Sequence, residues 1–116
     1  MLTACRQAKE NDRGAVYVNI TAEEAKQIMD SEEGYIILDV RTQEEYDQGH
    51  VPDAILIPNT EIKVRAVEEL TDKDQLILVY CRSGRRSKLA AEALVELGYT
   101  NIKEFGGIID WPYEVE

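Results

Sequence analysis

The chain has 116 residues, of which 44% are hydrophobic, and a formal net charge of -10. This length suits one domain with its own hydrophobic core. Its two cysteines are too few for a disulfide framework, and no segment approaches the roughly 20 consecutive apolar residues that span a bilayer. Nucleic-acid binding is not indicated either, because it needs a broad basic surface. The composition therefore predicts one acidic globular domain.

Residues 1–15 are polar and show no periodicity, so we interpret them as a disordered N-terminal arm before a single domain at 16–116. Leu2 to Cys5 resembles the cleavage box of bacterial lipoprotein signal peptides, although the charged and apolar regions that precede such a box are missing. As written, the sequence predicts a cytoplasmic protein. It predicts an exported lipoprotein if a signal peptide was removed upstream of Cys5.

The first half of the domain alternates short strands with short helices. Apolar runs at 16–20, 35–40 and 54–57 predict strands. A threonine followed three residues later by a glutamate opens the segments 21–30 and 42–49, which is the pattern of a helix capping box. These segments therefore predict two helices between the three strands.

The second half continues the alternation. Apolar spacing predicts helices over 60–70 and from residue 87 to a stop at Gly98, and strands at 76–80 and 101–105. A short helical cap follows at 108–111. Strands that alternate with helices in this way form a parallel sheet covered on both sides. We expect an α/β domain with a five-stranded parallel sheet and helices on both faces.

Cys81 directly follows the buried strand 76–80 and precedes the helix that we expect from Ser87. Ligands bind at this place in α/β sheets, because backbone N–H groups and the helix dipole favour negative charge there. A thiol in such a position should ionise readily, and the thiolate is the nucleophilic form. The alternative is that Cys81 is only a small buried hydrophobe.

Four cations follow Cys81 within seven residues and leave a net charge of -14 on the rest of the chain: Arg82, Arg85, Arg86 and Lys88. Cations at a helix N-terminus are unfavourable unless they face an anion. The cluster therefore indicates a small anionic ligand, although a basic cluster can also be just a solvated helix start.

Other polar and aromatic residues flank this region. Asp39 and Arg41 end the strand 35–40 and fall at the same edge of the sheet as Cys81 if the strands are parallel. His50, the only histidine, lies in a Gly-His-Val-Pro turn, and we interpret it as hydrogen-bonded scaffolding and not as a general base. Trp111 either packs in the core or forms one wall of the pocket, and we expect core packing.

Three segments, in order and at domain spacing, resemble the rhodanese-like family of single-domain thiosulfate sulfurtransferases: LDVRTQEEYDQGHVPDA at 38–54, CRSGRRS at 81–87 and GYTNIKEFGGIIDW at 98–111. The resemblance implies the same five-stranded α/β fold. It implies that Cys81 takes a sulfane sulfur from an anionic donor such as thiosulfate, becomes a persulfide, and passes the sulfur to a thiol or cyanide. We expect a monomer without a cofactor or a metal ion.

The resemblance also implies the site residues. Cys81 is the catalytic nucleophile, Asp39 and Arg41 support the loop, and the substrate is bound by Arg82, Ser83, Gly84, Arg85, Arg86 and Ser87. Loop amides from 82 to 87 would stabilise the anionic sulfur, Gly84 would let the backbone curl, and Ser87 would cap the helix. Arg82 and Arg86 would orient the donor, Arg86 pointing inward, whereas Arg85 can be merely solvated.

Two positions depart from the family pattern. Asp53 stands where glycine usually follows the turn, which is tolerable in a left-handed conformation because aspartate visits that region. Leu56 stands where asparagine is frequent. Neither position lies in the Cys81 loop, so only the edge of the strand at 54–57 is affected.

Two rival functions remain. Cysteine phosphatases and arsenate reductases also use a thiolate below a helix, but phosphatases place an arginine six residues after the cysteine, where this chain has Ser87. Some rhodanese-like domains act without catalysis as sulfur carriers or interaction modules. Those usually lack the cysteine that this chain retains.

Overall fold

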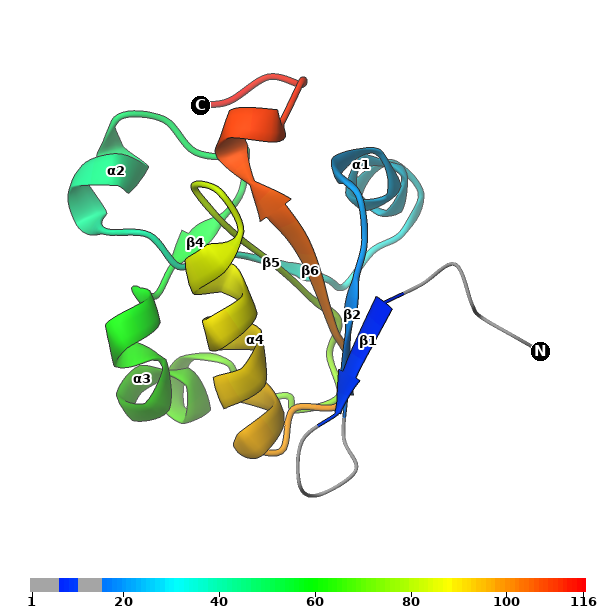
Figure 1. The fold of residues 1–116 in the computed structure, drawn as a ribbon, viewed down its shortest axis with the longest axis vertical. Coiled ribbons are helices and arrows are strands. Elements are labelled where there is room, and N and C mark those ends of the chain that lie inside the picture. The colour runs from blue at the N-terminus through cyan, green and yellow to red at the C-terminus, as the bar shows by residue number, and fades with distance from the viewer. Residues whose placement is uncertain (1–6, 11–15) are drawn as a thin grey trace.

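The computed structural model describes residues 7–10 and 16–116, which form a sheet flanked by helices (Figure 1). The strands are β1 (Gln7–Glu10), β2 (Val16–Asn19), β3 (Ile36–Asp39), β4 (Ile55–Leu56), β5 (Ile77–Cys81) and β6 (Ile102–Gly107). The α-helices are α1 (Ala22–Ser31), α2 (Gln43–Asp47), α3 (Ile62–Glu69) and α4 (Arg85–Glu96), and two short 3-10 helices are η1 (Asn59–Glu61) and η2 (Ile108–Asp110).

The sheet has the strand order β1-β2-β6-β5-β3-β4. All neighbours from β2 to β4 pair in parallel, which confirms the predicted α/β fold with five parallel strands. The sixth strand, β1, pairs antiparallel with β2 and lies inside the segment for which we expected no structure. An edge strand forms through main-chain hydrogen bonds and needs no apolar pattern of its own. Cys5 and the rest of residues 1–15 lie outside the described residues.

The helix starts follow the local sequence signals in two cases and depart from them in a third. Thr21 and Thr42 each close a full capping box, as predicted, at the starts of α1 and α2. Helix α4, however, begins at Arg85, so Ser87 is not its cap. Gly84 takes the N-cap position with a left-handed φ of 105°. This glycine turns the chain into the helix two residues earlier than the apolar spacing suggested.

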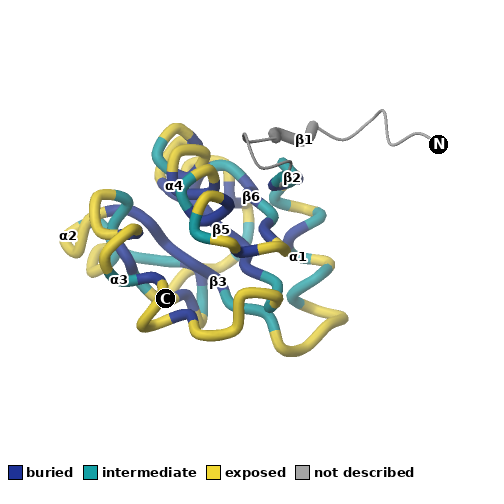
Figure 2. The backbone as a smooth tube through the Cα atoms, turned by 90° about the horizontal axis from the view of Figure 1, so that it is seen from below, coloured by how far each residue is buried: buried dark blue, intermediate teal, exposed yellow. Residues whose placement is uncertain are grey.

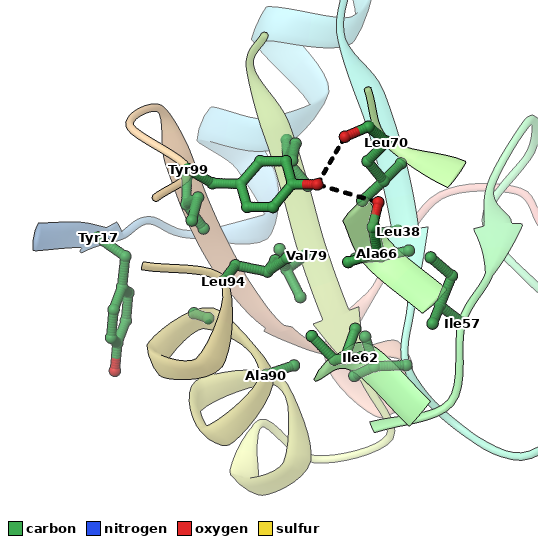
Figure 3. Close-up of a cluster of buried hydrophobic side chains, with 14 of the residues drawn as sticks. Tyr17, Leu38, Ile57, Ile62, Ala66, Leu70, Val79, Ala90, Leu94 and Tyr99 are labelled. Atoms are coloured by element: carbon green, nitrogen blue, oxygen red, sulfur yellow. Dashed lines mark hydrogen bonds between the residues drawn. The ribbon is translucent and has the colours of Figure 1, made fainter. Parts of the chain in front are cut away.

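The two faces of the sheet carry separate cores. Helices α3 and α4 cover one face and α1 the other (Figure 1). On the α3/α4 face, the Tyr99 hydroxyl donates to the Ala66 and Leu70 carbonyl oxygens and ties the end of α3 to the core (Figure 3). Buried backbone follows the central strands, whereas exposed segments lie on the outer helices and loops (Figure 2).

Strand β5 contributes to both cores because its side chains alternate. Val79 and Cys81 belong to the core under α3 and α4, and Leu78 and Tyr80 belong to the core under α1. Cys81 therefore ends the central strand with its side chain toward α4.

Candidate active site: the Cys81 loop

The Cys81 sulfur lies at the floor of a tight loop between β5 and α4. Its exposure is 1%, whereas Arg82 and Ser83 are exposed. The Gly84 amide donates a hydrogen bond to Cys81 Sγ at 3.0 Å, and Ser87 Oγ lies 3.4 Å from the same sulfur. The loop thus turns one main-chain donor onto the sulfur. We predicted that several amides of residues 82–87 surround a transferred sulfur atom, and for the amides other than that of Gly84 this stays a prediction.

The end of β6 supports the loop from below. The pairing of β5 with β6 shifts register between Val79 and Cys81, a β-bulge next to the site. A Cβ atom at Gly107 would stand 1.9 Å from the Arg82 carbonyl oxygen, so only glycine fits there. The Ile109 amide donates to that same oxygen at 3.2 Å. The close approach of the Arg82 carbonyl explains why residue 107, the second of the Gly-Gly pair, is a glycine.

Arg86 is held by an acidic residue that the sequence interpretation did not include. Its guanidinium donates to both carboxylate oxygens of Glu45 at 2.7 and 3.0 Å. These bonds lower the pKa of Glu45 to about 2 and raise the pKa of Arg86. The charge of Cys81 also contributes to the raised Arg86 pKa, so Arg86 lies within electrostatic range of the sulfur. The sequence marked Glu45 only as part of a capping box.

The remaining loop cations face solvent. Arg82, Arg85 and Lys88 are exposed, and within residues 16–116 the structure gives them no acidic partner. They are available to an anionic ligand, whereas Arg86 already has a counterion. We expected Arg82 and Arg86 to orient the donor and Arg85 to be merely solvated. Since Glu45 already pairs with Arg86, the exposed Arg82 and Arg85 are the candidates to bind a donor directly.

Asp39 and Arg41 form a buried ion pair on the α1 side of the sheet. Arg41 donates to both Asp39 oxygens and to the Gly49 carbonyl, and the Tyr80 hydroxyl also donates to Asp39. Burial opposes the charge of Arg41, but Asp39 leaves its pKa raised, and burial with this hydrogen bond raises the pKa of Tyr80. The pair braces the turn after α2 and the residue before Cys81. Its support of the loop stays a prediction.

Ser87 binds inward instead of capping the helix. It is buried, and its Oγ lies within hydrogen-bond distance of the Gly84 and Gly106 carbonyl oxygens and of Glu104 Oε2. Glu104 is fully buried and also accepts from Asn19 Nδ2 and from the Gly106 amide. The sequence interpretation missed Glu104. Glu104 lies two residues after the buried Ile102 on β6, so the two side chains share the inner face of the strand, and this spacing was the signal that could have found it.

The secondary predictions near the site are confirmed. His50 Nδ1 lies 2.9 Å from the Tyr46 carbonyl oxygen and its ring stacks on Tyr46, so it is scaffolding. Asp53 has a left-handed φ of 71°. Trp111 packs against Phe105 in the core on the α1 face. In the described part of the chain, the helices are too short or too polar to cross a membrane.

Comparison with known proteins places this α/β domain and its cysteine loop in a family. The chain belongs to the rhodanese-like domain family, whose model matches residues 21–112. Its relatives include the thiosulfate sulfurtransferase PspE of Escherichia coli, with 45% identity over 63% of this chain and 70% of PspE. YrkF of Bacillus subtilis, named as a sulfur carrier protein, is 40% identical over 84% of this chain and 52% of its own length.

A solved structure supports the same assignment. An E. coli rhodanese determined with anions superposes with a TM-score of 0.66 and 40% sequence identity, over 71% of this chain and 96% of that one. The family and the fold implied by the three sequence segments are thereby confirmed.

Proposed function

We propose that this protein is a sulfurtransferase that moves a sulfane sulfur from an anionic donor such as thiosulfate to a thiol or cyanide through a Cys81 persulfide. The observation that carries the proposal is the Gly84 amide pointed at Cys81 Sγ, with exposed arginines at the rim of the same loop that have no acidic partner within residues 16–116. The thiosulfate sulfurtransferase PspE among the relatives supports the choice of donor.

The proposed reaction needs no proton transfer to or from the donor. The Cys81 thiolate attacks the outer sulfur of thiosulfate, the S–S bond of thiosulfate breaks, and sulfite leaves with the electron pair. The new persulfide is an anion that main-chain N–H groups of the loop stabilise. Cyanide or a thiolate then attacks the outer sulfur, the bond to Sγ breaks, and the Cys81 thiolate returns.

The residues have separate tasks in this mechanism. Cys81 carries the sulfur, and the Gly84 amide stabilises its negative charge. Arg82 and Arg85 attract the sulfonate end of the donor from the open side of the loop, because they have no other counterion in the described structure. Arg86 adds positive potential near the sulfur while Glu45 keeps its guanidinium in place.

The test is sulfur uptake followed by turnover. We expect the parent protein to gain the mass of one sulfur atom from thiosulfate and then to form thiocyanate from cyanide. Cys81→Ser should do neither, and the matched variant Cys5→Ser should do both. Hydrolysis of an aryl phosphate without sulfur uptake would instead favour a cysteine phosphatase.

A sulfur carrier is the second candidate, and the similarity to YrkF supports it. The buried position of Cys81 also fits a protein that protects a persulfide from solvent. A carrier would gain the sulfur atom, form little thiocyanate, and release the sulfur to a protein thiol. Rapid turnover with cyanide decides against this candidate.

A further inference from the structure

Cys81, Ser87 and Glu104 form a continuous hydrogen-bonded chain beneath the loop. The Cys81 thiol lies 3.4 Å from Ser87 Oγ in donor geometry, and Ser87 Oγ makes its shortest contact with Glu104 Oε2. All three residues are at most 1% exposed. Because the three residues are buried, their polar groups are satisfied by other protein groups.

Ser87 has one hydroxyl proton, which can serve only one acceptor at a time. When Glu104 receives that proton in a hydrogen bond, Ser87 presents a lone pair to Cys81, which suits a thiol that donates. A Cys81 anion, which the Gly84 amide already contacts, would gain a second donor only if the Ser87 proton pointed at sulfur. Glu104 would then face the serine lone pair. The sulfur anion and the carboxylate therefore compete for one donor.

The remaining partners of Glu104 show that it is held as an acceptor. Its donors are Asn19 Nδ2, Ser87 Oγ and the Gly106 amide, all of them neutral groups. No lysine or arginine of the described residues forms an ion pair with it. Glu104 is thus held by neutral donors alone among the described residues, and Ser87 is the one of them that also contacts the sulfur.

We propose that Glu104 is a positioning residue that, by holding the Ser87 hydroxyl proton, sets the pH at which the Cys81 sulfur becomes an anion. The inference deepens the proposed function, because the anion is the nucleophile of that function. Glu104 does not touch the substrate in this account and acts only through Ser87.

Other charged groups around the chain act on it differently. Arg86 on α4 lies within electrostatic range of Cys81 and favours the anion. Glu45 on α2 and Asp39 on β3 also act on Arg86. Tyr17 on β2 and Glu92 on α4 are titratable neighbours on the Glu104 side, and burial followed by the charges of Glu92 and Glu104 raises the pKa of Tyr17. Glu92 is exposed and makes no hydrogen bond with Ser87, so it offers a matched control for a change of charge.

The experiment measures the rate of iodoacetamide alkylation at Cys81 against pH, with peptide mass spectrometry to separate Cys81 from Cys5. We expect Glu104→Gln to move the midpoint of this profile down by about one pH unit, since a neutral amide competes less strongly than a carboxylate for the Ser87 hydroxyl proton. The control Glu92→Gln should move it by less than about 0.2 unit. An unchanged or higher midpoint in Glu104→Gln overturns the inference.

Ser87→Ala tests whether the effect passes through the hydroxyl, and also serves if Glu104→Gln does not fold. We expect Ser87→Ala to lower the midpoint, because the thiol loses its acceptor. The double variant S87A/E104Q should show the same midpoint as S87A within about 0.3 unit. A midpoint that rises in Ser87→Ala would show that the serine donates to the sulfur and would overturn the inference.

Alkylation is independent of sulfur transfer, so the two proposals fail separately. A downward shift in Glu104→Gln without sulfur uptake by the parent protein would overturn the proposed function alone. Sulfur uptake with an unshifted profile would overturn the role of Glu104 alone.

Discussion

Two buried carboxylates, Asp39 and Glu104, lie on opposite faces of the sheet and differ in what neutralises them. Both are 0% exposed. Asp39 pairs with the cation Arg41 at 2.7 Å. Glu104, as far as the described residues show, accepts only from neutral donors and connects to the Cys81 sulfur through Ser87. A buried charge with its own counterion is a structural element, while one without a counterion retains its influence on neighbouring groups. The comparison therefore distinguishes Asp39, which stabilises the fold, from Glu104, which we propose acts on the nucleophile Cys81.

Asp39→Asn should have the largest effect on stability. The substitution leaves the Arg41 guanidinium buried without a counterion, which costs about 3 to 5 kcal/mol. Urea denaturation measures the loss. A loss of stability below about 1 kcal/mol would contradict the structural role of the pair between Asp39 and Arg41.

Glu104→Gln should cost less, about 1 to 2 kcal/mol, because its partners are neutral and an amide of equal size still accepts from Asn19 or Gly106. The same denaturation experiment applies. If Glu104→Gln proved as damaging as Asp39→Asn, the two carboxylates would share a purely structural role.

Glu45→Gln should have a smaller effect of about 1 kcal/mol, because the pair with Arg86 is partly exposed. The pKa of Glu45 is about 2 in the folded protein against an ordinary value of 4.5, so the pair stabilises the fold above pH 4.5 and loses this contribution as the pH falls toward 2. Stability measured across that window should fall less steeply in Glu45→Gln, which keeps a side chain able to close the capping box. An identical slope would contradict the prediction.

The exposed arginines should matter least for folding. Replacing both Arg82 and Arg85 by alanine should change stability by less than about 0.5 kcal/mol, because neither has a partner within the described residues. The KM for thiosulfate should rise about tenfold, since two charges that attract the donor are lost. Lys63→Ala, which removes an exposed cation from α3, is the control and should leave this KM unchanged. Equal KM values in all three proteins would exclude these arginines from donor binding.

The accuracy of the sequence interpretation follows the range of the interactions involved. The capping boxes at Thr21 and Thr42 and the left-handed Asp53 were predictable, because each depends on residues within one turn. The start of α4 was misplaced, because the apolar spacing from Ser87 does not report the conformation of Gly84. The edge strand β1 was missed, because its hydrogen bonds come from β2 and not from its own pattern.

The sequence alone determined the α/β fold and the place of Cys81 between a strand and a helix, because apolar periodicity and turn residues act locally. The family was predicted from the resemblance of three segments to known motifs and not from periodicity. The tertiary structure decided which polar side chains meet: Arg86 with Glu45 across 41 residues, and Ser87 with Glu104 across 17. Side chains so distant in the chain become partners only when helices pack on the sheet. Packing therefore determined the electrostatic surroundings of the nucleophile.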